Sequence, residues 1–223
     1  MSRQRRFSQV SGFILAGGTG RRMGFDKAHL PLGSESLLDR QIRLLRSVCR
    51  SVAILGPAAR FANAGIPVYE DEISGRGPLG GICTGLRRAR TELSLFLGCD
   101  MPLMEVRFLR YLCEQALESC ALATIPPPWE KGRYPLCAVL RRCALVMINS
   151  CLGSGRNQVG RFLARVPHRA ISKAEFARQG FSTRIFCNLN TPEDYERVKN
   201  LLCCHPEPFA VILDDSCLAL RLR

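Results

Sequence analysis

Residues 10–27 read VSGFILAGGTGRRMGFDK, a short apolar run followed by a glycine-rich segment. The apolar part, Val10–Leu15, predicts a buried strand. The glycines of residues 17–24 allow a sharp turn after it and let backbone N–H groups face an anion. The arginines within this segment favour a negatively charged ligand. A strand that runs into such a turn is typical of a phosphate-binding α/β protein.

Short apolar runs alternate with amphipathic stretches along the rest of the chain. The strands expected after the first are 51–55, 67–69, 93–97, 122–125, 134–140 and 185–188. The helices expected are 36–49, 80–90, 106–117, 142–151, 157–166 and a last one that opens at Thr191-Pro192. This alternation predicts an α/β fold, a mainly parallel sheet with helices on both faces. In such folds ligands bind beyond the carboxyl ends of the strands.

The composition is that of a globular protein with an excess of positive charge. The chain has 223 residues, of which 47% are hydrophobic and 23% charged, and its formal net charge is +13. Only four of the 32 basic residues are lysine. Such a charge favours phosphates, nucleotides, nucleic acid or an acidic membrane surface as partners. No apolar run reaches the roughly 18 residues of a membrane-spanning helix, and we expect no membrane association.

The 12 cysteines raise the question of metal or disulfide sites. None of them form a C-x-x-C pair, and none lie near a pair of histidines at zinc-finger spacing. The first residues also lack the apolar core and small-residue cleavage site of a secretory signal. We therefore expect reduced thiols, many of them in the core, in a cytoplasmic protein.

The glycine-rich segment matches neither common phosphate-binding fingerprint. It contains no G-x-x-x-x-G-K-[ST], and Met23 stands where the dinucleotide motif has its third glycine. Arg21, Arg22 and Lys27 nevertheless place three positive charges next to the turn. A triphosphate needs such neutralisation before another anion can attack it. The alternative is a strand-to-helix turn with solvated arginines.

Two aspartates follow predicted strands. Asp100 comes just after the apolar run 93–97, where a single carboxylate suits a Mg²⁺ ion that bridges phosphate oxygens. Its alternative role is a helix cap. Asp71 follows the run 67–69 and is either a hydrogen-bond acceptor for a base or ribose, or a turn residue. The glycines of residues 77–81 permit a ligand to approach closely or simply form a tight bend.

The late segment Asn188-Leu189-Asn190-Thr191-Pro192 carries two amides on one face of an extended chain. They could hydrogen-bond a polar heterocycle or satisfy loop backbone. Trp129 and Tyr134 lie near a triple proline, where an acceptor pocket could form. No ordered aromatic set suggests base stacking, so we expect no nucleic-acid binding.

Together these segments resemble the molybdenum cofactor guanylyltransferase family over about residues 12–202. That family shows L-A-G-G and R-M-G-x-D-K early, then E-D, G-P-L-x-G, C-D-x-P and N-x-N-T-P-E-[DE]. The matching segments here are 15–18, 22–27, 70–71, 77–81, 99–102 and 188–194. The first motif is shared with sugar-1-phosphate and cytidylyl enzymes, and the last one points to the molybdopterin branch.

The resemblance implies a Rossmann-like nucleotidyltransferase that joins GMP from GTP to molybdopterin-bound molybdenum, with release of pyrophosphate. Mg²⁺ is the implied cofactor, held by Asp100. GTP and molybdopterin are the implied partners, with cofactor-insertion proteins or recipient molybdoenzymes as further candidates. The implied catalytic residues are Arg22, Lys27 and Asp100. The implied binding residues are Leu15, Ala16, Gly17, Gly18, Lys27, Asp71, Asp100, Asn188 and Asn190.

The preference for GTP depends on Gly17, because related cytidylyltransferases usually read L-A-A-G here. Where the family often has an asparagine after the second strand, this chain reads Leu55-Gly56-Pro57-Ala58. We expect one nucleotidyltransferase domain, residues 1–203, and an extension of unknown role, residues 204–223. A cytidylyltransferase, a sugar-1-phosphate nucleotidyltransferase, a basic nucleic-acid-binding module and a cofactor-delivery scaffold are the alternatives.

Overall fold

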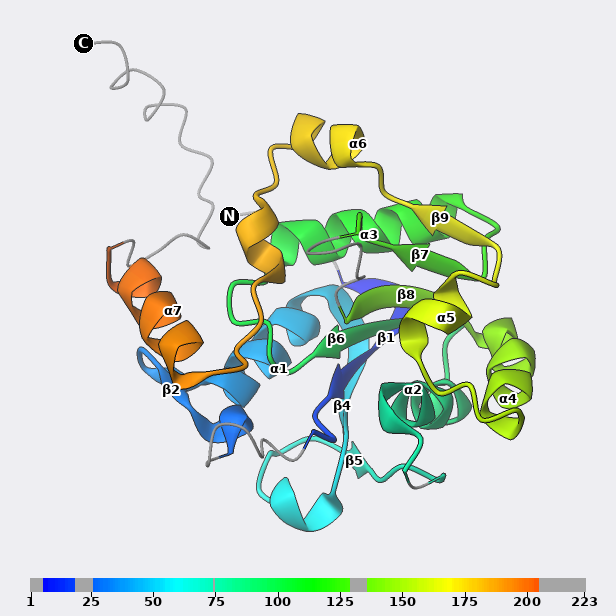
Figure 1. Ribbon diagram of the computed structural model, residues 1–223, viewed down its shortest axis with the longest axis horizontal. Coiled ribbons are helices and arrows are strands. Elements are labelled where there is room, and N and C mark those ends of the chain that lie inside the picture. Colours follow the sequence, from blue (N-terminus) through cyan, green and yellow to red (C-terminus); the bar gives the residue numbers. More distant parts are fainter. Residues whose placement is uncertain (1–5, 19–25, 74, 129–135, 205–223) are drawn as a thin grey trace.

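A computed structural model describes residues 6–18, 26–73, 75–128 and 136–204, arranged around a seven-stranded sheet (Figure 1). The strand order is β5-β4-β1-β6-β8-β7-β9. β8 runs antiparallel to both β6 and β7, and the other pairings are parallel. The strands are β1 (Phe7–Leu15), β4 (Cys49–Leu55), β5 (Val68–Tyr69), β6 (Leu93–Gly98), β7 (Ala123–Ile125), β8 (Cys137–Arg141) and β9 (His168–Ala170).

The first strand lies at the centre of the half of the sheet formed by β5, β4, β1 and β6. β1 pairs with β4 on one side and with β6 on the other, so the chain changes direction across the sheet at this point. Leu15 lies opposite Leu55 in β4 and opposite Gly98 in β6, and Leu55 lies opposite Tyr69 in β5. The carboxyl ends of four parallel strands are therefore level with one another, at the place where α/β sheets bind ligands.

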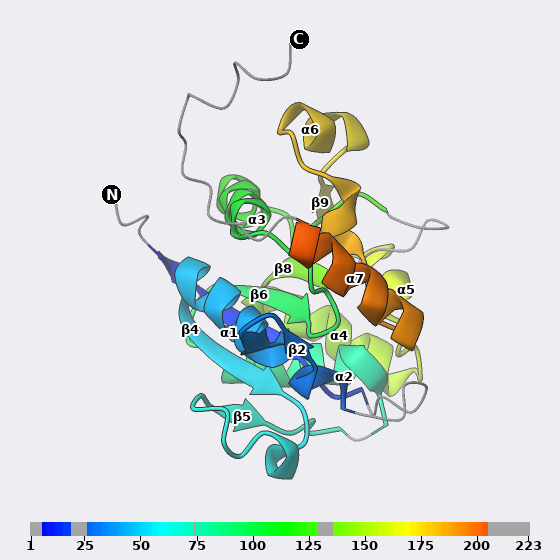
Figure 2. The ribbon, with the colours of Figure 1, turned by 90° about the vertical axis from the view of Figure 1, so that its left-hand side faces the viewer.

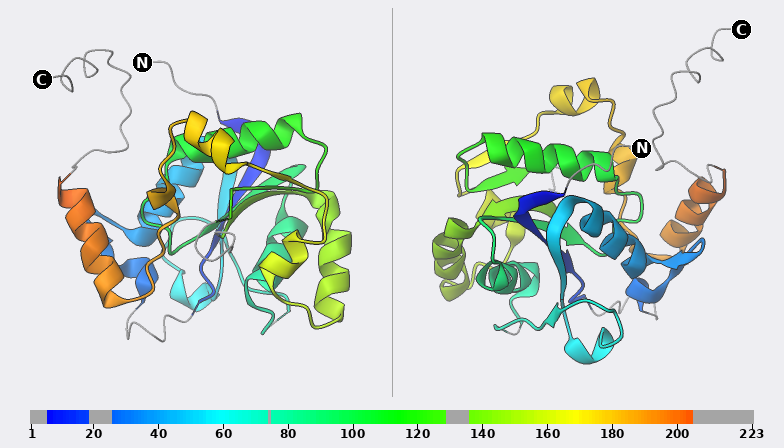
Figure 3. Two further views of the ribbon diagram at one scale, coloured as in Figure 1. Left: turned by 45° about the horizontal axis from the view of Figure 1, so that its top comes forward. Right: turned by 180° about the vertical axis from the view of Figure 1, so that it is seen from behind.

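Helices cover both faces of the sheet, as the sequence predicts (Figure 3). Along β1, Ile14 belongs to one apolar core and Phe13 to the other, because successive strand side chains point to opposite faces. The first core is packed by α1 (Leu37–Val48), α3 (Val106–Glu118) and part of α7 (Pro192–Cys204). The second is packed by α2 (Gly77–Arg88), α4 (Leu145–Gly153) and α5 (Val159–Leu163).

Side-chain caps fix where several helices begin. Ser36 caps α1 by accepting a hydrogen bond from the backbone N–H of Asp39 at 3.1 Å. Thr191 does the same for the N–H of Asp194 at 3.2 Å, at the start of α7. Both helices were expected from these capping residues, and both are confirmed.

The strand expected over residues 185–188 is wrong, because residues Thr183–Phe186 form a 3-10 helix, η5. Ser182 caps this turn, and Ile185 and Phe186 are both buried in the first core. Two adjacent buried residues fit a tight helical turn better than a strand, whose neighbouring side chains face opposite ways. The elements that the sequence did not predict are β2 (Pro31–Leu32), β3 (Glu35–Ser36), β9, α6 (Lys173–Arg178), η1 (Lys27–His29) and η2 (Ala58–Arg60).

The last helix returns to the beginning of the chain. α7 lies beside the β2–β3 hairpin, where the Tyr195 hydroxyl donates to the carbonyl of Pro31 at 2.7 Å (Figure 2). The extension beyond α7, residues 205–223, lies outside the described residues, so the predicted domain boundary stays a prediction. Among the described helices, none combines the length and apolar character needed to cross a membrane.

The cysteines whose side chains the structure describes are all free thiols. Several of them are buried, as expected for thiols that belong to the core. The buried ones are Cys49, Cys83, Cys99, Cys113 and Cys137.

Candidate active site

A cavity of about 580 Å³ opens at the carboxyl ends of β1, β4, β5 and β6. It is large enough for a nucleotide-sized ligand. Segments from residue 15 to residue 136 contribute to its wall. The predicted site residues that line it are Leu15, Ala16, Gly17, Gly18, Lys27, Asp71 and Asp100.

The turn after β1 presents bare backbone to the cavity. The N–H of Ala16 donates to the carbonyl of Leu55 at 2.9 Å, which extends the β1–β4 ladder by one residue. Among the described residues, a methyl group added at Gly17 or Gly18 would meet no atom within 4 Å. The role of Gly17 in the choice of nucleotide stays a prediction. Arg21 and Arg22 lie outside the described residues, and the catalytic role of Arg22 stays a prediction.

Lys27 joins the early and late parts of the chain. Its Nζ donates to the carbonyl of Leu189 at 2.6 Å and to Oδ1 of Asn190 at 3.3 Å. Leu189 is fully buried, whereas Asn188 and Asn190 are exposed on either side of it. The two amides thus share a face, as predicted, and Asn190 reaches the lysine at the edge of the cavity.

Asp100 is packed tightly at the end of β6. A methyl group at Gly98 would lie 2.8 Å from its Oδ1, so any larger residue at position 98 would force this carboxylate to move. The carbonyl of Asp100 accepts from the N–H of Leu189 at 2.8 Å. Burial raises the pKa of Asp100 above its ordinary value, and the charge of Lys27 opposes that shift. A metal ion in the cavity would favour the ionised form.

Two buried side chains of α1 hold the segment that follows Asp100. Gln41 donates from Nε2 to the carbonyl of Met101 at 2.8 Å. Arg40 donates from Nε to the carbonyl of Pro102 at 2.6 Å. Because both contacts are buried, they fix this turn firmly against the sheet.

Asp71 lies half-buried on another wall of the cavity, beside the first turns of α2. Methyl groups at Gly81 and Gly80 would lie 3.3 and 3.6 Å from its two carboxylate oxygens, so the glycines leave the carboxylate its space. Burial raises the pKa of Asp71. Within the described parts of the chain, no donor hydrogen-bonds its carboxylate. The carboxylate is thus available as a hydrogen-bond acceptor for a ligand.

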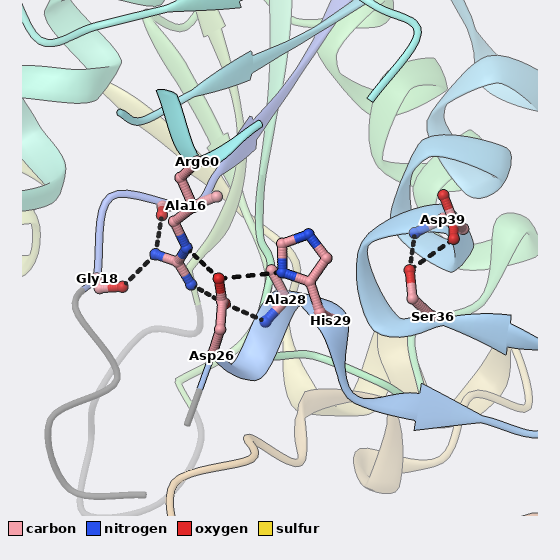
Figure 4. A network of polar contacts seen from close by, with 8 residues as sticks. All are labelled: Ala16, Gly18, Asp26, Ala28, His29, Ser36, Asp39 and Arg60. Atoms are coloured by element: carbon pink, nitrogen blue, oxygen red, sulfur yellow. Dashed lines mark hydrogen bonds and ion pairs between the residues drawn. The ribbon is translucent and has the colours of Figure 1, made fainter. Parts of the chain in front are cut away.

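Arg60, in η2 after β4, is a charged residue of the cavity that sequence reasoning missed (Figure 4). Its Nη1 donates to the carbonyls of Gly18 at 2.8 Å and Ala16 at 3.3 Å. Its Nε donates to Oδ2 of Asp26 at 2.5 Å, and its Nη2 also bonds this carboxylate. No motif marks Arg60, because its partners lie 34 to 44 residues away in sequence.

Cys99 also lines the cavity, next to Asp100. Its thiol is buried, and burial raises its pKa to about 12. A neutral thiol is a poor nucleophile, so Cys99 contributes to the cavity as a small apolar wall residue. Trp129 and Tyr134, the aromatic residues suggested for an acceptor pocket, lie outside the described residues.

Comparisons with known proteins identify the family of this chain. Residues 12–199 match the family model described as the MobA-like NTP transferase domain. The chain belongs to this family. It is a nucleotidyltransferase with the Rossmann-like fold that the sequence predicts.

Named relatives show how far the likeness extends. A molybdenum cofactor guanylyltransferase of Syntrophotalea carbinolica is 33% identical over 188 residues, which cover 84% of this chain and 89% of the relative. The crystal structure of the molybdopterin-guanine dinucleotide biosynthesis protein A of Archaeoglobus fulgidus has a TM-score of 0.74 at 20% identity, covering 87% of this chain and 99% of that one.

A second solved structure has another substrate in its name. The 2-C-methyl-D-erythritol 4-phosphate cytidylyltransferase of Thermus thermophilus is 16% identical, with a TM-score of 0.62 and coverage of 86% of this chain and 98% of that one. The fold is therefore common to guanylyl and cytidylyl enzymes. The fold alone therefore does not determine the choice of nucleotide.

The nucleotidyltransferase cavity offers few protein ligands to a metal. Within the described ranges, no three His, Cys, Asp or Glu side chains gather at metal-binding distance. Asp100, packed beside Gly98 and Leu189, is the carboxylate that the sequence predicts as the metal ligand. This donor set fits Mg²⁺, which typically uses one or two carboxylates together with substrate phosphates and water.

Proposed function

We propose that this enzyme transfers GMP from GTP to the phosphate of molybdopterin-bound molybdenum cofactor, releasing pyrophosphate. The observation that carries the proposal is the junction at Lys27. This one side chain lies on the nucleotide cavity and contacts the late segment that carries Asn190. The names of the relatives support a nucleotidyltransferase role in molybdenum cofactor biosynthesis.

The reaction joins two anions, which determines what the protein must do. A phosphate oxygen of the pterin attacks the α-phosphorus of GTP, and the bond to the bridging oxygen breaks as pyrophosphate leaves. The glycine backbone at residues 17–18 would face the phosphates, and Lys27 would place a positive charge beside them. Asn188 and Asn190 would face the pterin. Because a phosphate monoester is already largely ionised near neutral pH, no general base is required.

Asp100 would hold Mg²⁺, and the bound ion would neutralise phosphate charge as the α–β bond breaks. The role of this chain's residues is to place the carboxylate. Gly98 leaves room for the carboxylate of Asp100. The N–H of Leu189 donates to the backbone carbonyl of Asp100 and holds it in place.

Asp71 supports guanine as the base. A carboxylate only accepts hydrogen bonds, and it can pair with two parallel donors at once. Guanine presents such donors at N1–H and N2–H, whereas cytosine presents N4–H beside an acceptor. The half-buried position of Asp71, with no protein donor among the described residues, makes it suited to this pairing.

The test is pyrophosphate release with Mg²⁺ and molybdenum-loaded molybdopterin, run in parallel with GTP, CTP, ATP and UTP. Release with GTP alone is expected. Release with CTP would overturn the guanylyl assignment while keeping the mechanism. Release with a sugar phosphate in place of the pterin would favour a sugar-1-phosphate nucleotidyltransferase.

Two variants refine this test. Asp100→Asn removes the metal-binding charge and should reduce turnover by about 100-fold or more. Asp71→Asn should erode the preference for GTP over CTP, because the amide replaces one acceptor by a donor. Asp39→Asn, an exposed change in α1 outside the cavity, is the matched control. Recipient molybdoenzymes, insertion proteins and the cytoplasmic location stay predictions.

A further inference from the structure

Arg60 lines the cavity, but the hydrogen bonds of its guanidinium go to Ala16, Gly18 and Asp26, which lie far from it in sequence. One nitrogen, Nη1, donates to two backbone carbonyls after β1. The other two nitrogens engage both carboxylate oxygens of Asp26 (Figure 4). These partners are the last described residues before, and the first described residue after, residues 19–25.

Asp26 in turn determines where η1 begins. Its Oδ1 accepts from the N–H of Ala28 at 3.0 Å, which is the cap of this 3-10 helix. Lys27 is the first residue of η1. The backbone that carries the phosphate-side lysine is therefore attached to Asp26, and Asp26 is attached to Arg60.

The backbone around Arg60 is itself held in place. The N–H of Ala58 donates to Oε1 of Glu70 at 2.8 Å, and the N–H of Arg60 to the carbonyl of Pro57 at 3.1 Å. The guanidinium also stacks over the ring of Phe61, 4.9 Å from its centroid, and Phe61 is 2% exposed. Because its backbone and ring contacts are fixed, Arg60 can hold its hydrogen-bonded partners at a set place relative to β4.

We propose that Arg60 is a positioning residue that ties the backbone after β1 to Asp26 and thereby sets where Lys27 stands. This inference rests on the proposed nucleotide site and deepens it. Arginine suits the task because its planar fork binds a carboxylate through two nitrogens and still has donors for carbonyls. Lysine has a single nitrogen and cannot reproduce this two-nitrogen pairing with a carboxylate.

The pairing also separates this role from direct phosphate binding. The positive charge of Arg60 is balanced by Asp26, whose pKa the guanidinium lowers to about 2. At neutral pH the pair is therefore uncharged overall. A residue that bound phosphate directly would become a stronger ligand if Asp26 lost its charge, whereas a positioning residue would lose its anchor.

The experiment compares Arg60→Gln, Asp26→Asn and the double variant. Binding of a ribose-labelled fluorescent GTP with Mg²⁺ gives the Kd, and steady-state pyrophosphate release gives kcat and both KM values. For a lost charged hydrogen-bond pair we expect the Kd and KM for GTP to rise about 10- to 100-fold in each single variant. The double variant should be no worse than either single one, and the KM for the pterin should not change.

Asp26→Asn that binds GTP as well as or better than the wild type would overturn the positioning role and make Arg60 a direct ligand. Equal changes in the KM for GTP and the KM for the pterin, together with a lower melting temperature, would show a general structural role for Arg60. That result would also overturn the positioning role. If Arg60→Gln does not fold, Arg60→Lys takes its place, since it keeps the charge and loses the fork. Its expected KM for GTP is likewise raised.

The matched control is Arg43→Gln. Arg43 donates through two nitrogens to the carboxylate of Glu35, at 2.5 and 3.0 Å, outside the cavity. Its replacement by glutamine should therefore leave the KM for GTP unchanged. Wild-type protein that binds CTP instead of GTP would refute the guanylyl assignment alone, and the same variants measured with CTP would still decide the role of Arg60. Wild-type protein that binds no nucleotide would refute both.

Discussion

Gly98→Ala tests, with a single methyl group, the packing of Asp100, the carboxylate proposed to hold Mg²⁺. The added Cβ would lie 2.8 Å from Oδ1 of Asp100. A relaxed carbon–oxygen contact is about 3.3 Å or longer, so the oxygen must move by about 0.5 Å. Because Oδ1 is the end of a side chain, the carboxylate can rotate away without unfolding the strand. The cost should appear in catalysis rather than in stability.

A displacement of about 1 Å in a catalytic group can reduce rates about 100-fold. A shift of about 0.5 Å in the carboxylate of Asp100 should therefore reduce kcat about 10-fold. That corresponds to about 1.4 kcal/mol of activation free energy. The assay is pyrophosphate release over a range of Mg²⁺ concentrations, together with thermal unfolding. We expect a lower kcat, a higher Mg²⁺ requirement and a nearly unchanged melting temperature.

The matched control is Gly160→Ala in α5, where a methyl group would meet no atom of the described residues within 4 Å. It should leave activity unchanged and gain up to about 1 kcal/mol from helix propensity. Wild-type kcat and Mg²⁺ dependence in a folded Gly98→Ala protein would show that the position of Asp100 does not limit the reaction.

Three further outcomes follow from the structure. Lys27→Ala should reduce pyrophosphate release by about 100- to 1,000-fold while far-UV circular dichroism stays the same; a tenfold loss or less would contradict its phosphate role. Phe108→Ala should cost about 3–5 kcal/mol in urea unfolding, because Phe108 is 0% exposed and its ring edge meets three other phenylalanines. Arg169 and Tyr111 lower the pKa of Glu175 from 4.5 to about 2, so its stabilising effect is complete above pH 4.5 and is lost as the pH falls toward 2. Glu175→Gln should flatten the melting-temperature profile over that interval, and an unchanged profile would rule out this contribution.

Local sequence patterns were enough to predict most of the sheet and the helices. Val10–Leu15 and the run 93–97 are apolar because both strands are buried between two layers of helices. The capping residues Ser36 and Thr191 mark helix starts by local hydrogen bonds that need no tertiary context. Such features can be predicted from the sequence because the interacting groups lie within a few residues of one another.

The elements that were missed depend on distant contacts. β9 has three residues and is a strand only because it pairs with β7. The run 185–188 has the composition of a strand, but burial of Ile185 and Phe186 against α3 and α6 favours a helical turn. Tertiary packing overrides such short preferences.

The same division applies to the cavity. Lys27, Asp71 and Asp100 follow strands or turns in recognisable motifs, and the structure places all three on one cavity. Arg60 has no local signature, because its function as a tie exists only once β1 and β4 are paired. Sequence patterns thus reveal the groups that face the ligand better than those that hold them in place.

The bond between Lys27 and Leu189 has a consequence for the order in which the enzyme becomes competent. It joins residues 162 positions apart, so the lysine leaves the ribosome long before the carbonyl that orients it. The paired strands β1, β4, β5 and β6 are synthesised first, together with every aspartate of the cavity. A nascent chain can therefore assemble the nucleotide-facing half early, but it acquires an oriented lysine only when the segment before α7 docks. Competence for catalysis is in this sense a late event in the life of each new chain.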